Sequence, residues 1–325
     1  MKQMIEICRG SGGYTGEYKA KKALGLCKPM LIMMCGLQGS GKSTCAKELA
    51  KHFNAEVFSS DELRIELYDD VNDQKHNNKL YHELHKRIKD CLKSGKDAIY
   101  DATNVNSKRR KSFLQELNKI DCFKCCVIMA TPYEQCLNNN KSRDRVVPGH
   151  VIDRTYRSFN PPYWFEGWDS IELMYWTDAE NSMDIMEQIH KYMDYNQDNP
   201  HHTLTLGEHC MMTGHKLKDN RLLFYAGLLH DLGKPHVKSF INSKKEATDI
   251  AHYYNHEHVG AYDSLFYEYD GVNALDVSVL IDLHMRSYVW ERDNNERLRN
   301  KCKKLWGDKL FANIKLLHEA DKQSH

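Results

Sequence analysis

The 325-residue sequence has no apolar run long enough to cross a lipid bilayer, and its first residues do not have the layout of a secretion signal. It also lacks the pair of CxxC motifs that a zinc finger needs, although it contains 11 cysteines. Its net charge is only +1, so overall charge does not indicate a nucleic-acid-binding protein. We therefore expect a globular protein of the cytoplasm, without a membrane partner, whose cysteines are reduced.

Basic residues are concentrated locally even though the chain is nearly neutral. Lys108-Arg109-Arg110-Lys111 forms one basic run, and a looser series follows at Arg143, Arg145, Arg154 and Arg157. Such runs are usually solvated faces of helices, so they are only a weak sign of nucleic-acid binding.

Short apolar runs alternate with helical patterns in the first half of the chain. Met30–Cys35 is a continuous apolar run, typical of a buried parallel strand. Shorter strands are expected at residues 57–58, 98–100 and 125–129. This alternation predicts an α/β domain over residues 30–180, with a parallel sheet flanked by helices.

The strand signals fade after residue 180. Residues 181–199 include a polar, turn-rich stretch and are expected to be a linker, as residues 1–29 are expected to be an irregular leader. Beyond residue 200 apolar residues recur at helical spacing, so we expect an all-α domain over residues 200–325.

A glycine-rich segment lies between the first expected strand and the first expected helix. Gly36-Leu37-Gln38-Gly39-Ser40-Gly41-Lys42-Ser43 fits the phosphate-loop pattern GxxxxGK[ST]. In that pattern backbone N–H groups surround the phosphates, the lysine reaches the β and γ phosphates, and the hydroxyl holds Mg²⁺. The sequence therefore predicts a site for ATP, or another nucleoside triphosphate, with Mg²⁺. The residues expected to bind it are Gly36, Gly39, Ser40, Gly41, Lys42, Ser43 and Thr44.

Polar residues follow the other expected strands. Asp61 comes just after the second strand, where a carboxylate can accept a proton from an attacking hydroxyl, although an Asp at this place is often a helix cap. Asp101 ends the third strand and is expected to support the metal or the surroundings of Asp61. An arginine near residue 143 is expected to close over the phosphates and stabilise the transferring group.

The second half carries a His-Asp pair at the end of an apolar helix. Adjacent side chains on a helix point about 100° apart, so His230 and Asp231 can bind one metal only if other elements complete the set. His209 and Asp321 are the candidates. Such a mixed set suits a divalent hydrolytic metal, Mn²⁺, Ni²⁺, Co²⁺ or Mg²⁺, without selecting one. The metal would activate water and polarise a phosphoryl oxygen.

The motifs of residues 30–165 together resemble the 5′-hydroxyl polynucleotide kinases of bacteriophage end-repair enzymes. The resemblance implies that Asp61 is the general base and that Arg64, in a D-x-x-R segment, contacts the acceptor phosphate. It also matches Asp101-Ala102-Thr103-Asn104, followed by Arg109-Arg110, to a DTN segment with paired arginines. The lid arginine is better matched by Arg143, although Arg145 stays open because the lid is one residue shorter here.

The second half resembles an HD-superfamily phosphohydrolase over residues 200–325. The resemblance implies a role as metal ligands for the H…HD…D residues His209, His230, Asp231 and Asp321. In members with two metals two further histidines contribute, for which His256 and His284 match best. Lys234 resembles a contact to the substrate phosphate. For His252, His258 and His318 an ordinary structural role is at least as well supported.

The phage kinases usually carry a different phosphatase, with a D-x-D-G-T motif that this chain lacks. The resemblance is therefore to bifunctional RNA-repair enzymes in which an HD module takes its place. It implies 5′-OH phosphorylation and removal of 2′,3′-cyclic, 2′- or 3′-phosphate ends. RNA ends, tRNA among them, are the favoured partner. A ligase would act downstream, in the cytoplasm of a bacterium or a phage-infected host.

Two other functions stay open at this point. One is a small-molecule or nucleoside kinase fused to an HD nucleotide phosphohydrolase, against which the basic series of residues 108–157 argues weakly. The other is a non-catalytic, nucleotide-gated regulatory module, against which the intact Lys42, Asp61, His230 and Asp231 argue.

Overall fold

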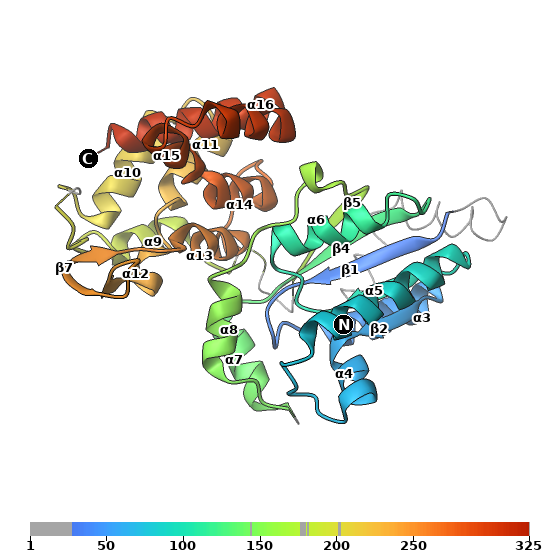
Figure 1. Cartoon of the computed structure of the whole chain (residues 1–325). Helices are drawn as coiled ribbons and strands as arrows, with labels where there is room; N and C mark the ends of the chain where they lie inside the picture. Colours follow the sequence, from blue (N-terminus) through green and yellow to red (C-terminus); the bar gives the residue numbers. More distant parts are fainter. Residues whose placement is uncertain (1–27, 144, 176–179, 181, 201–202, 325) are drawn as a thin grey trace. The chain divides into compact units, whose positions relative to one another are not determined.

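The computed structural model describes residues 28–143, 145–175, 180, 182–200 and 203–324. All but two residues of the expected leader at 1–29 lie outside the described residues. Contacts between residues divide the described chain into two units, both visible in Figure 1. One unit comprises residues 28–147 and 162–175, and the other comprises residues 148–161 and 180–324.

The first unit is built on a five-stranded sheet in the order β2-β3-β1-β4-β5. The strands are β1 (Met30–Cys35), β2 (Glu56–Ser59), β3 (Ala98–Asp101), β4 (Phe123–Ala130) and β5 (Ser170–Tyr175). All neighbouring strands pair in parallel. The expected α/β fold is confirmed, and β5 is an edge strand that the sequence did not predict.

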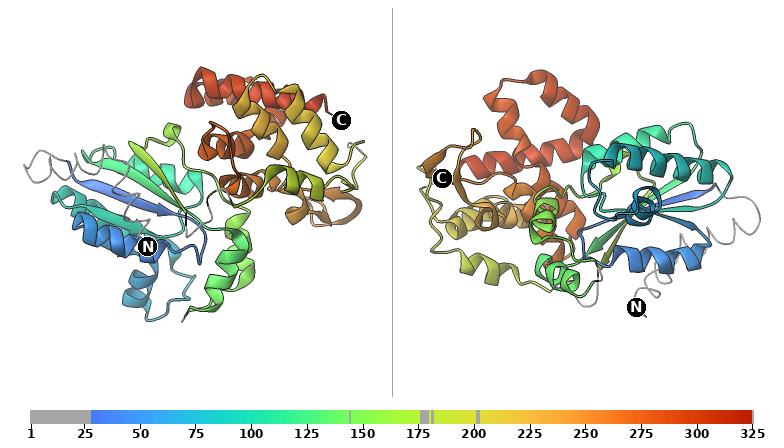
Figure 2. Two further views of the ribbon diagram at one scale, coloured as in Figure 1. Left: turned by 180° about the vertical axis from the view of Figure 1, so that it is seen from behind. Right: turned by 60° about the horizontal axis from the view of Figure 1, so that its bottom comes forward.

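Helices cover both faces of this sheet (Figure 2). They are α3 (Lys42–Phe53), α4 (Ser60–Tyr68), α5 (Asn77–Lys93), α6 (Ser107–Glu116) and α7 (Tyr133–Lys141). Alternate residues of β1 form one core with α3, because successive strand side chains point to opposite faces. This core includes Met30, Ile32, Met34, Cys45, Ala46 and Leu49. It fixes the end of β1 and the start of α3, and so fixes the loop between them.

The second unit is largely helical, as expected. Its helices are α8 (Gly149–Tyr156), α9 (Ile185–Lys191), α10 (Leu206–Lys216), α11 (Arg221–Leu229), α12 (Lys234–Val237), α13 (His256–Asp263), α14 (Ala274–Leu283), α15 (Arg286–Arg292) and α16 (Glu296–Lys322). α16 bends at Gly307, whose φ of 78° is not helical. One feature departs from an all-α unit: β6 (Ser239–Ile241) and β7 (Ala247–His252) form an antiparallel hairpin between α12 and α13.

No helix in the described part of the chain has both the length and the apolar character that crossing a membrane requires.

Candidate functional sites

The glycine-rich loop adopts a conformation that needs glycine. Gly39 and Gly41 have φ values of 80° and 88°, in the left-handed region that side chains disfavour. A Cβ on Gly39 would lie 2.3 Å from the backbone oxygen of Cys136. Gly41 is also the N-cap of α3, so the loop ends at the positive end of a helix dipole. This arrangement fits the phosphates of a nucleotide.

Lys42 lies in the loop with its ammonium group turned to the backbone. Its Nζ donates to the oxygen of Leu37 and, at 3.3 Å, to Ser40 Oγ. Burial lowers the pKa of Lys42, and the nearby Asp101 carboxylate opposes that shift. Ser43, which follows at the start of α3, is exposed. The donors expected to hold a triphosphate and Mg²⁺ are therefore together at one helix terminus.

Asp61 does not cap α4. Ser59 is the N-cap, and its hydroxyl accepts from the backbone N–H of Glu62. The Asp61 carboxylate is about half exposed and pairs with Arg145 at 2.8 Å between Oδ1 and a guanidinium nitrogen. Arg145 Nε also donates to Asn72 Oδ1 at 3.1 Å. Ser59 therefore caps the helix in place of Asp61. The Asp61 carboxylate lies at the edge of the sheet beside Arg145.

Arg64 lies one turn further along α4 and is buried. One terminal nitrogen donates to the backbone oxygen of Asp73. Its buried Nε has no hydrogen-bond partner among the residues that the structure describes. The guanidinium therefore keeps a donor beyond its contact with Asp73.

The segment after β3 is fastened to the start of the phosphate loop. Gly36 N–H donates to the Thr103 oxygen at 2.9 Å, and Asn104 Nδ2 donates to the Met34 oxygen at 2.9 Å. Asp101, at the end of β3, is buried. Its charge acts on Lys42, so both lie in one electrostatic environment.

The basic run at 108–111 is not one solvated face. Arg110 is fully buried in a bidentate ion pair with Glu166, at 2.8 Å and 2.6 Å. Its remaining terminal nitrogen donates to the Asn104 oxygen at 2.8 Å, so it supports the segment after β3. Lys108 and Arg109 are exposed. The expectation that the whole run forms a solvated helix face is therefore wrong at Arg110. This residue instead stabilises the fold through its buried ion pair.

The two candidate lid arginines face different groups. Besides burial, the positive charge of Arg143 contributes to lowering the pKa of Lys42, so this charge reaches the phosphate loop. Arg145 instead contacts Asp61. The segment they share is held by Asn140, whose amide group makes two hydrogen bonds to the backbone of Val147 at 2.8 Å and 3.0 Å.

In the second unit four histidines and two aspartates gather in one buried cluster, which we call the HD cluster. Its members are His209, His230, Asp231, His256, His284 and Asp321. Two triads in it have ligand atoms within 4.8 Å of one another: His209, His230 and Asp231, and Asp231, His256 and His284. All six residues expected from the sequence as metal ligands are thus brought together.

Asp231 joins the two triads. Its Oδ2 lies 3.3 Å and 3.4 Å from the Nε2 atoms of His209 and His230. Its Oδ1 lies 3.0 Å from His256 Nε2 and 3.9 Å from His284 Nε2. Asp321 Oδ1 completes the first triad at 3.2 Å from His209 and 3.5 Å from His230. Each carboxylate oxygen of Asp231 therefore serves a different group of ligands.

Each cluster histidine is oriented through its other ring nitrogen. The Nδ1 atoms lie 2.7–2.8 Å from backbone oxygens, which fixes Nδ1–H as donor and turns Nε2 into the cluster. The partners are Ser324 for His209, Gly227 for His230, Tyr253 for His256 and Ile281 for His284. Converging Nε2 atoms and carboxylate oxygens are the donors that a divalent cation takes. The donor set thus fits one or two such ions.

The electrostatics of the HD cluster favour a cation. Although burial opposes it, Lys234 and the histidines hold the pKa of Asp231 well below its usual range. Burial alone would lower the pKa of His209, but its hydrogen bonds to Asp231 and Asp321 raise it to about 10. Burial and then the neighbouring His256 and His230 lower the pKa of His284 to about 3. Asp231 and Asp321 therefore stay ionised. Their negative charge favours a positive charge beside them, either a protonated histidine or a metal ion.

His256 reaches the HD cluster because the backbone at Gly233 packs closely against the backbone at the start of α13. A Cβ on Gly233 would lie 2.2 Å from the His256 oxygen, so only glycine lets the segment after Asp231 touch α13. His209 is placed by the first turn of α10, where Thr205 and Glu208 form a capping box.

Lys234 lies directly beside the HD cluster. Its Nζ is 2.6 Å from Asp231 Oδ2 and donates to Gln197 Oε1 at 2.8 Å. Tyr288 donates to Asp321 Oδ2 at 3.0 Å. The sequence did not point to Gln197 or Tyr288, because neither belongs to a recognisable spacing.

Of the three histidines left open, His258 pairs with Asp282 at 2.7 Å, outside the cluster.

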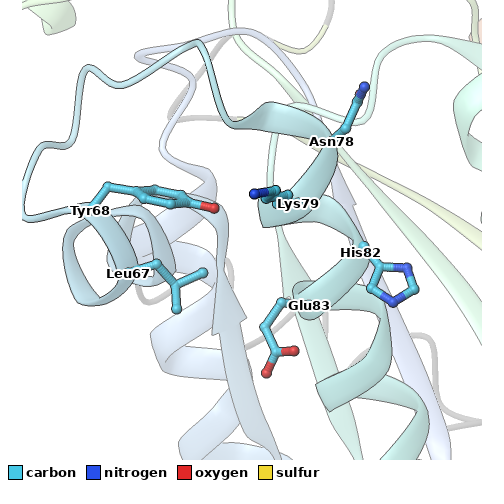
Figure 3. Close-up of a pocket in the computed structure, with 6 residues that line it drawn as sticks. All are labelled: Leu67, Tyr68, Asn78, Lys79, His82 and Glu83. Atoms are coloured by element: carbon cyan, nitrogen blue, oxygen red, sulfur yellow. The ribbon is translucent and has the colours of Figure 1, made fainter.

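A surface groove of about 530 Å³ lies between α4 and α5 (Figure 3). Its lining residues are Leu67, Tyr68, Asn78, Lys79, His82 and Glu83. None of the residues predicted from the sequence lines it.

Comparison with known families matches the two halves of the chain to two family models. A family model described as an AAA domain matches residues 31–162, and one described as an HD domain matches residues 201–324. The chain therefore carries a P-loop kinase domain followed by an HD domain. The first implies a nucleotide with Mg²⁺, and the second implies a divalent metal.

Among curated proteins the chain is similar to the L-seryl-tRNA(Sec) kinase of Methanococcus maripaludis. The two are 23% identical over 171 residues, which is 52% of this chain and 66% of the kinase. The chain thus spans just under two thirds of that relative.

Two solved structures illustrate the general likeness. A gluconokinase from Sinorhizobium meliloti 1021 is 12% identical, with 47% of this chain and 85% of that chain covered and a TM-score of 0.35. A chain of the Pnkp1/Rnl/Hen1 RNA repair complex is 20% identical, with 40% and 43% covered and a TM-score of 0.34. At these scores neither likeness bears on function.

Proposed function

We propose that this chain is a bifunctional end-healing enzyme. Its P-loop domain would phosphorylate 5′-OH ends of a polynucleotide with ATP. Its HD domain would remove 2′,3′-cyclic, 2′- or 3′-phosphate from the other end. The observation that carries the proposal is one chain holding both a phosphate loop with a carboxylate at the sheet edge and a buried six-ligand cluster of metal-binding type.

In the kinase site the residues have distinct roles. Lys42 and Ser43 hold the triphosphate with Mg²⁺, which neutralises phosphate charge when bound. Asp61 accepts the proton of the attacking 5′-hydroxyl, and Arg143 stabilises the γ-phosphoryl group in transfer. The half-exposed carboxylate of Asp61 supports this role, because a general base must reach its substrate.

Arg64 and Arg145 are proposed to serve the acceptor. The buried Nε of Arg64 supports a contact to the acceptor phosphate, since it is a donor without a partner among the described residues. Arg145 would hold the Asp61 carboxylate in place before the acceptor enters. This assignment makes Arg143 the lid arginine and Arg145 a positioning residue.

In the HD site His209, His230, Asp231, His256, His284 and Asp321 would hold the divalent metal, which supplies activated water and polarises the phosphoryl oxygen. Lys234, held at 2.6 Å from Asp231, would contact the substrate phosphate. The two acidic residues stay ionised because their pKa values are depressed, which keeps them available as ligands.

Two separation-of-function variants test the proposal. The substrates are a 5′-OH oligoribonucleotide with labelled ATP and Mg²⁺, and an oligoribonucleotide with a 2′,3′-cyclic phosphate and Mn²⁺. Asp61→Asn should abolish phosphorylation and spare phosphate removal, and Asp231→Ala should do the reverse. Asp90→Asn and Asp308→Ala, at exposed carboxylates, are the controls for the two substitutions in turn. If either site variant stays folded but loses both activities, the two-site proposal is wrong.

A second candidate follows from the relative in Methanococcus maripaludis. That protein is named a kinase of L-seryl-tRNA(Sec), so its acceptor is carried on a tRNA and is not itself a polynucleotide end. A kinase of this kind would phosphorylate a small hydroxyl compound, or one attached to RNA. Transfer of label to such an acceptor, with none to a 5′-OH oligonucleotide, would favour this candidate.

A further inference from the structure

The β6–β7 hairpin and the turn that follows it display exposed apolar side chains on the second unit. Phe240, Ile241, Ile250 and Tyr254 are 44%, 53%, 40% and 48% exposed, and we call these four the hairpin patch. Figure 1 shows the hairpin beside α12 and α13, the helices that flank it in the chain. Exposed apolar groups gathered on one short segment are a candidate binding surface.

Aromatic rings and basic groups are interleaved around the hairpin patch. The Nζ of Lys238 lies 4.8 Å from the ring centre of Tyr195 and 5.7 Å from that of Phe240. His252 stacks on Tyr254 with ring centres 5.4 Å apart and planes at 8°. Exposed Lys244 and Lys245 lie in the turn of the hairpin. Lys238 is paired with Asp198, and Glu246 and Asp249 are also exposed on the hairpin, so Lys244 and Lys245 in the turn are the cations that face outward. Flat rings with cations beside them are what a single nucleic-acid strand requires, because bases stack and phosphates need cations.

The hairpin leads directly to the HD cluster. Tyr253, the residue after β7, accepts at its backbone oxygen from His256 Nδ1 at 2.8 Å and so orients a cluster histidine. Its ring centre is 5.4 Å from Lys234 Nζ, and its hydroxyl donates to the Gln197 oxygen. Lys234 in turn contacts Asp231. The hairpin patch and the cluster are therefore connected through one residue.

We propose that the hairpin patch binds the bases next to the terminal phosphate when that phosphate lies at the HD cluster. The inference rests on the proposed phosphohydrolase function and specifies its substrate class: a single-stranded polynucleotide end and not a free nucleotide. Phe240 and Tyr254 stack on bases, and the exposed Lys244 and Lys245 neutralise the backbone. A mononucleotide reaches only the cluster and Lys234, and so gains nothing from the hairpin.

The test compares two substrates on the full chain. One is a 3′-phosphorylated oligoribonucleotide, and the other is a nucleoside 3′-monophosphate, each with Mn²⁺. In Phe240→Ala and Tyr254→Ala the KM for the oligonucleotide should rise roughly 5- to 150-fold, as expected on losing one stacked base. The kcat should be unchanged, and the kinetics with the mononucleotide should match the wild type. The control is Leu305→Ala, a 41% exposed apolar residue on α16.

A binding measurement separates this inference from the proposed activity. Fluorescence anisotropy of a labelled single-stranded oligoribonucleotide should show weaker binding by Phe240→Ala than by Leu305→Ala, even if neither substrate is hydrolysed. Weaker binding by Phe240→Ala, together with no hydrolysis by the wild type, would contradict the proposed phosphohydrolase function. It would still support the hairpin patch as a surface that binds a nucleic-acid strand. Unchanged oligonucleotide binding in both hairpin variants would overturn the inference and make the patch a surface for something other than nucleic acid. An equal rise in KM for both substrates would overturn it as well.

Discussion

The buried pair of Arg110 and Glu166 gives a sharp prediction about the first unit. Both side chains are fully buried, and two hydrogen bonds of 2.8 Å and 2.6 Å join them. Trp168 Nε1 adds a third donor to Glu166 at 3.0 Å. Glu166→Gln keeps the shape of the side chain but leaves the Arg110 charge buried without an opposite charge.

The expected cost is large because the charge cannot reach water. Removing one partner of a buried ion pair typically destabilises by about 3–5 kcal/mol. For a unit of this size that corresponds to a fall in Tm of about 6–20 °C. Replacing both partners by apolar residues, Arg110→Met with Glu166→Met, should recover part of the loss because no buried charge remains.

The assay is differential scanning calorimetry of the full chain. The transition that shifts in the core variant Ile32→Ala identifies the first unit. Glu66→Gln is the matched control, because Glu66 makes the same bidentate contact to Arg87, at 2.6 Å and 2.8 Å, on the surface. An exposed pair contributes less than about 1 kcal/mol. Equal shifts for Glu166→Gln and Glu66→Gln would refute the reasoning.

Further predictions concern the sites and the second unit. Lys42→Ala and Arg143→Ala should each lower the kinase kcat by about 10²-fold or more, and Arg145→Ala by less than tenfold, in assays with labelled ATP. Treatment with EDTA should abolish phosphate removal, and Mn²⁺ added at about 100 times its Kd should restore it and stabilise the second unit by about 2.7 kcal/mol in calorimetry. Burial raises the pKa of Asp263 to about 7, so the folded chain keeps a proton that the unfolded chain loses near pH 4. Asp263 therefore contributes stability that is lost as the pH rises from about 4 to about 7, opposite in sign to the contribution of His284, whose folded pKa is about 3. Relative to the wild type, Asp263→Asn should lack the Asp263 contribution in urea unfolding at each pH.

Much of the fold could be predicted because its signals are local. The continuous apolar run of β1 and the glycines after it specify a strand, a loop and a helix in order. β5 escaped prediction because it is an edge strand of which only Met174 is buried, so its sequence lacks the apolar run of a central strand. The β6–β7 hairpin escaped for a similar reason: its strands are short and mostly exposed.

The candidate sites divide in the same way. Lys42, His230 and Asp231 lie in compact motifs, so their spacing alone points to chemistry. Gln197 contacts Lys234, 37 residues away in the chain, and Tyr288 contacts Asp321, 33 residues away, so only the folded structure brings each to its partner. The burial of Arg110 could not be predicted from the sequence either, because its partner Glu166 is 56 residues away in the chain. Charge patterns in a sequence do not reveal which charges are paired inside.

The central claim is that one chain acts on both ends of a broken strand. The most direct measurement uses a single oligoribonucleotide with a 5′-OH and a 2′,3′-cyclic phosphate, incubated with the wild-type chain, ATP, Mg²⁺ and Mn²⁺ and then analysed by mass spectrometry. The account predicts a product with a 5′-phosphate and a free 3′ end. An RNA unchanged at both ends, while the same protein phosphorylates or hydrolyses small molecules, would contradict it.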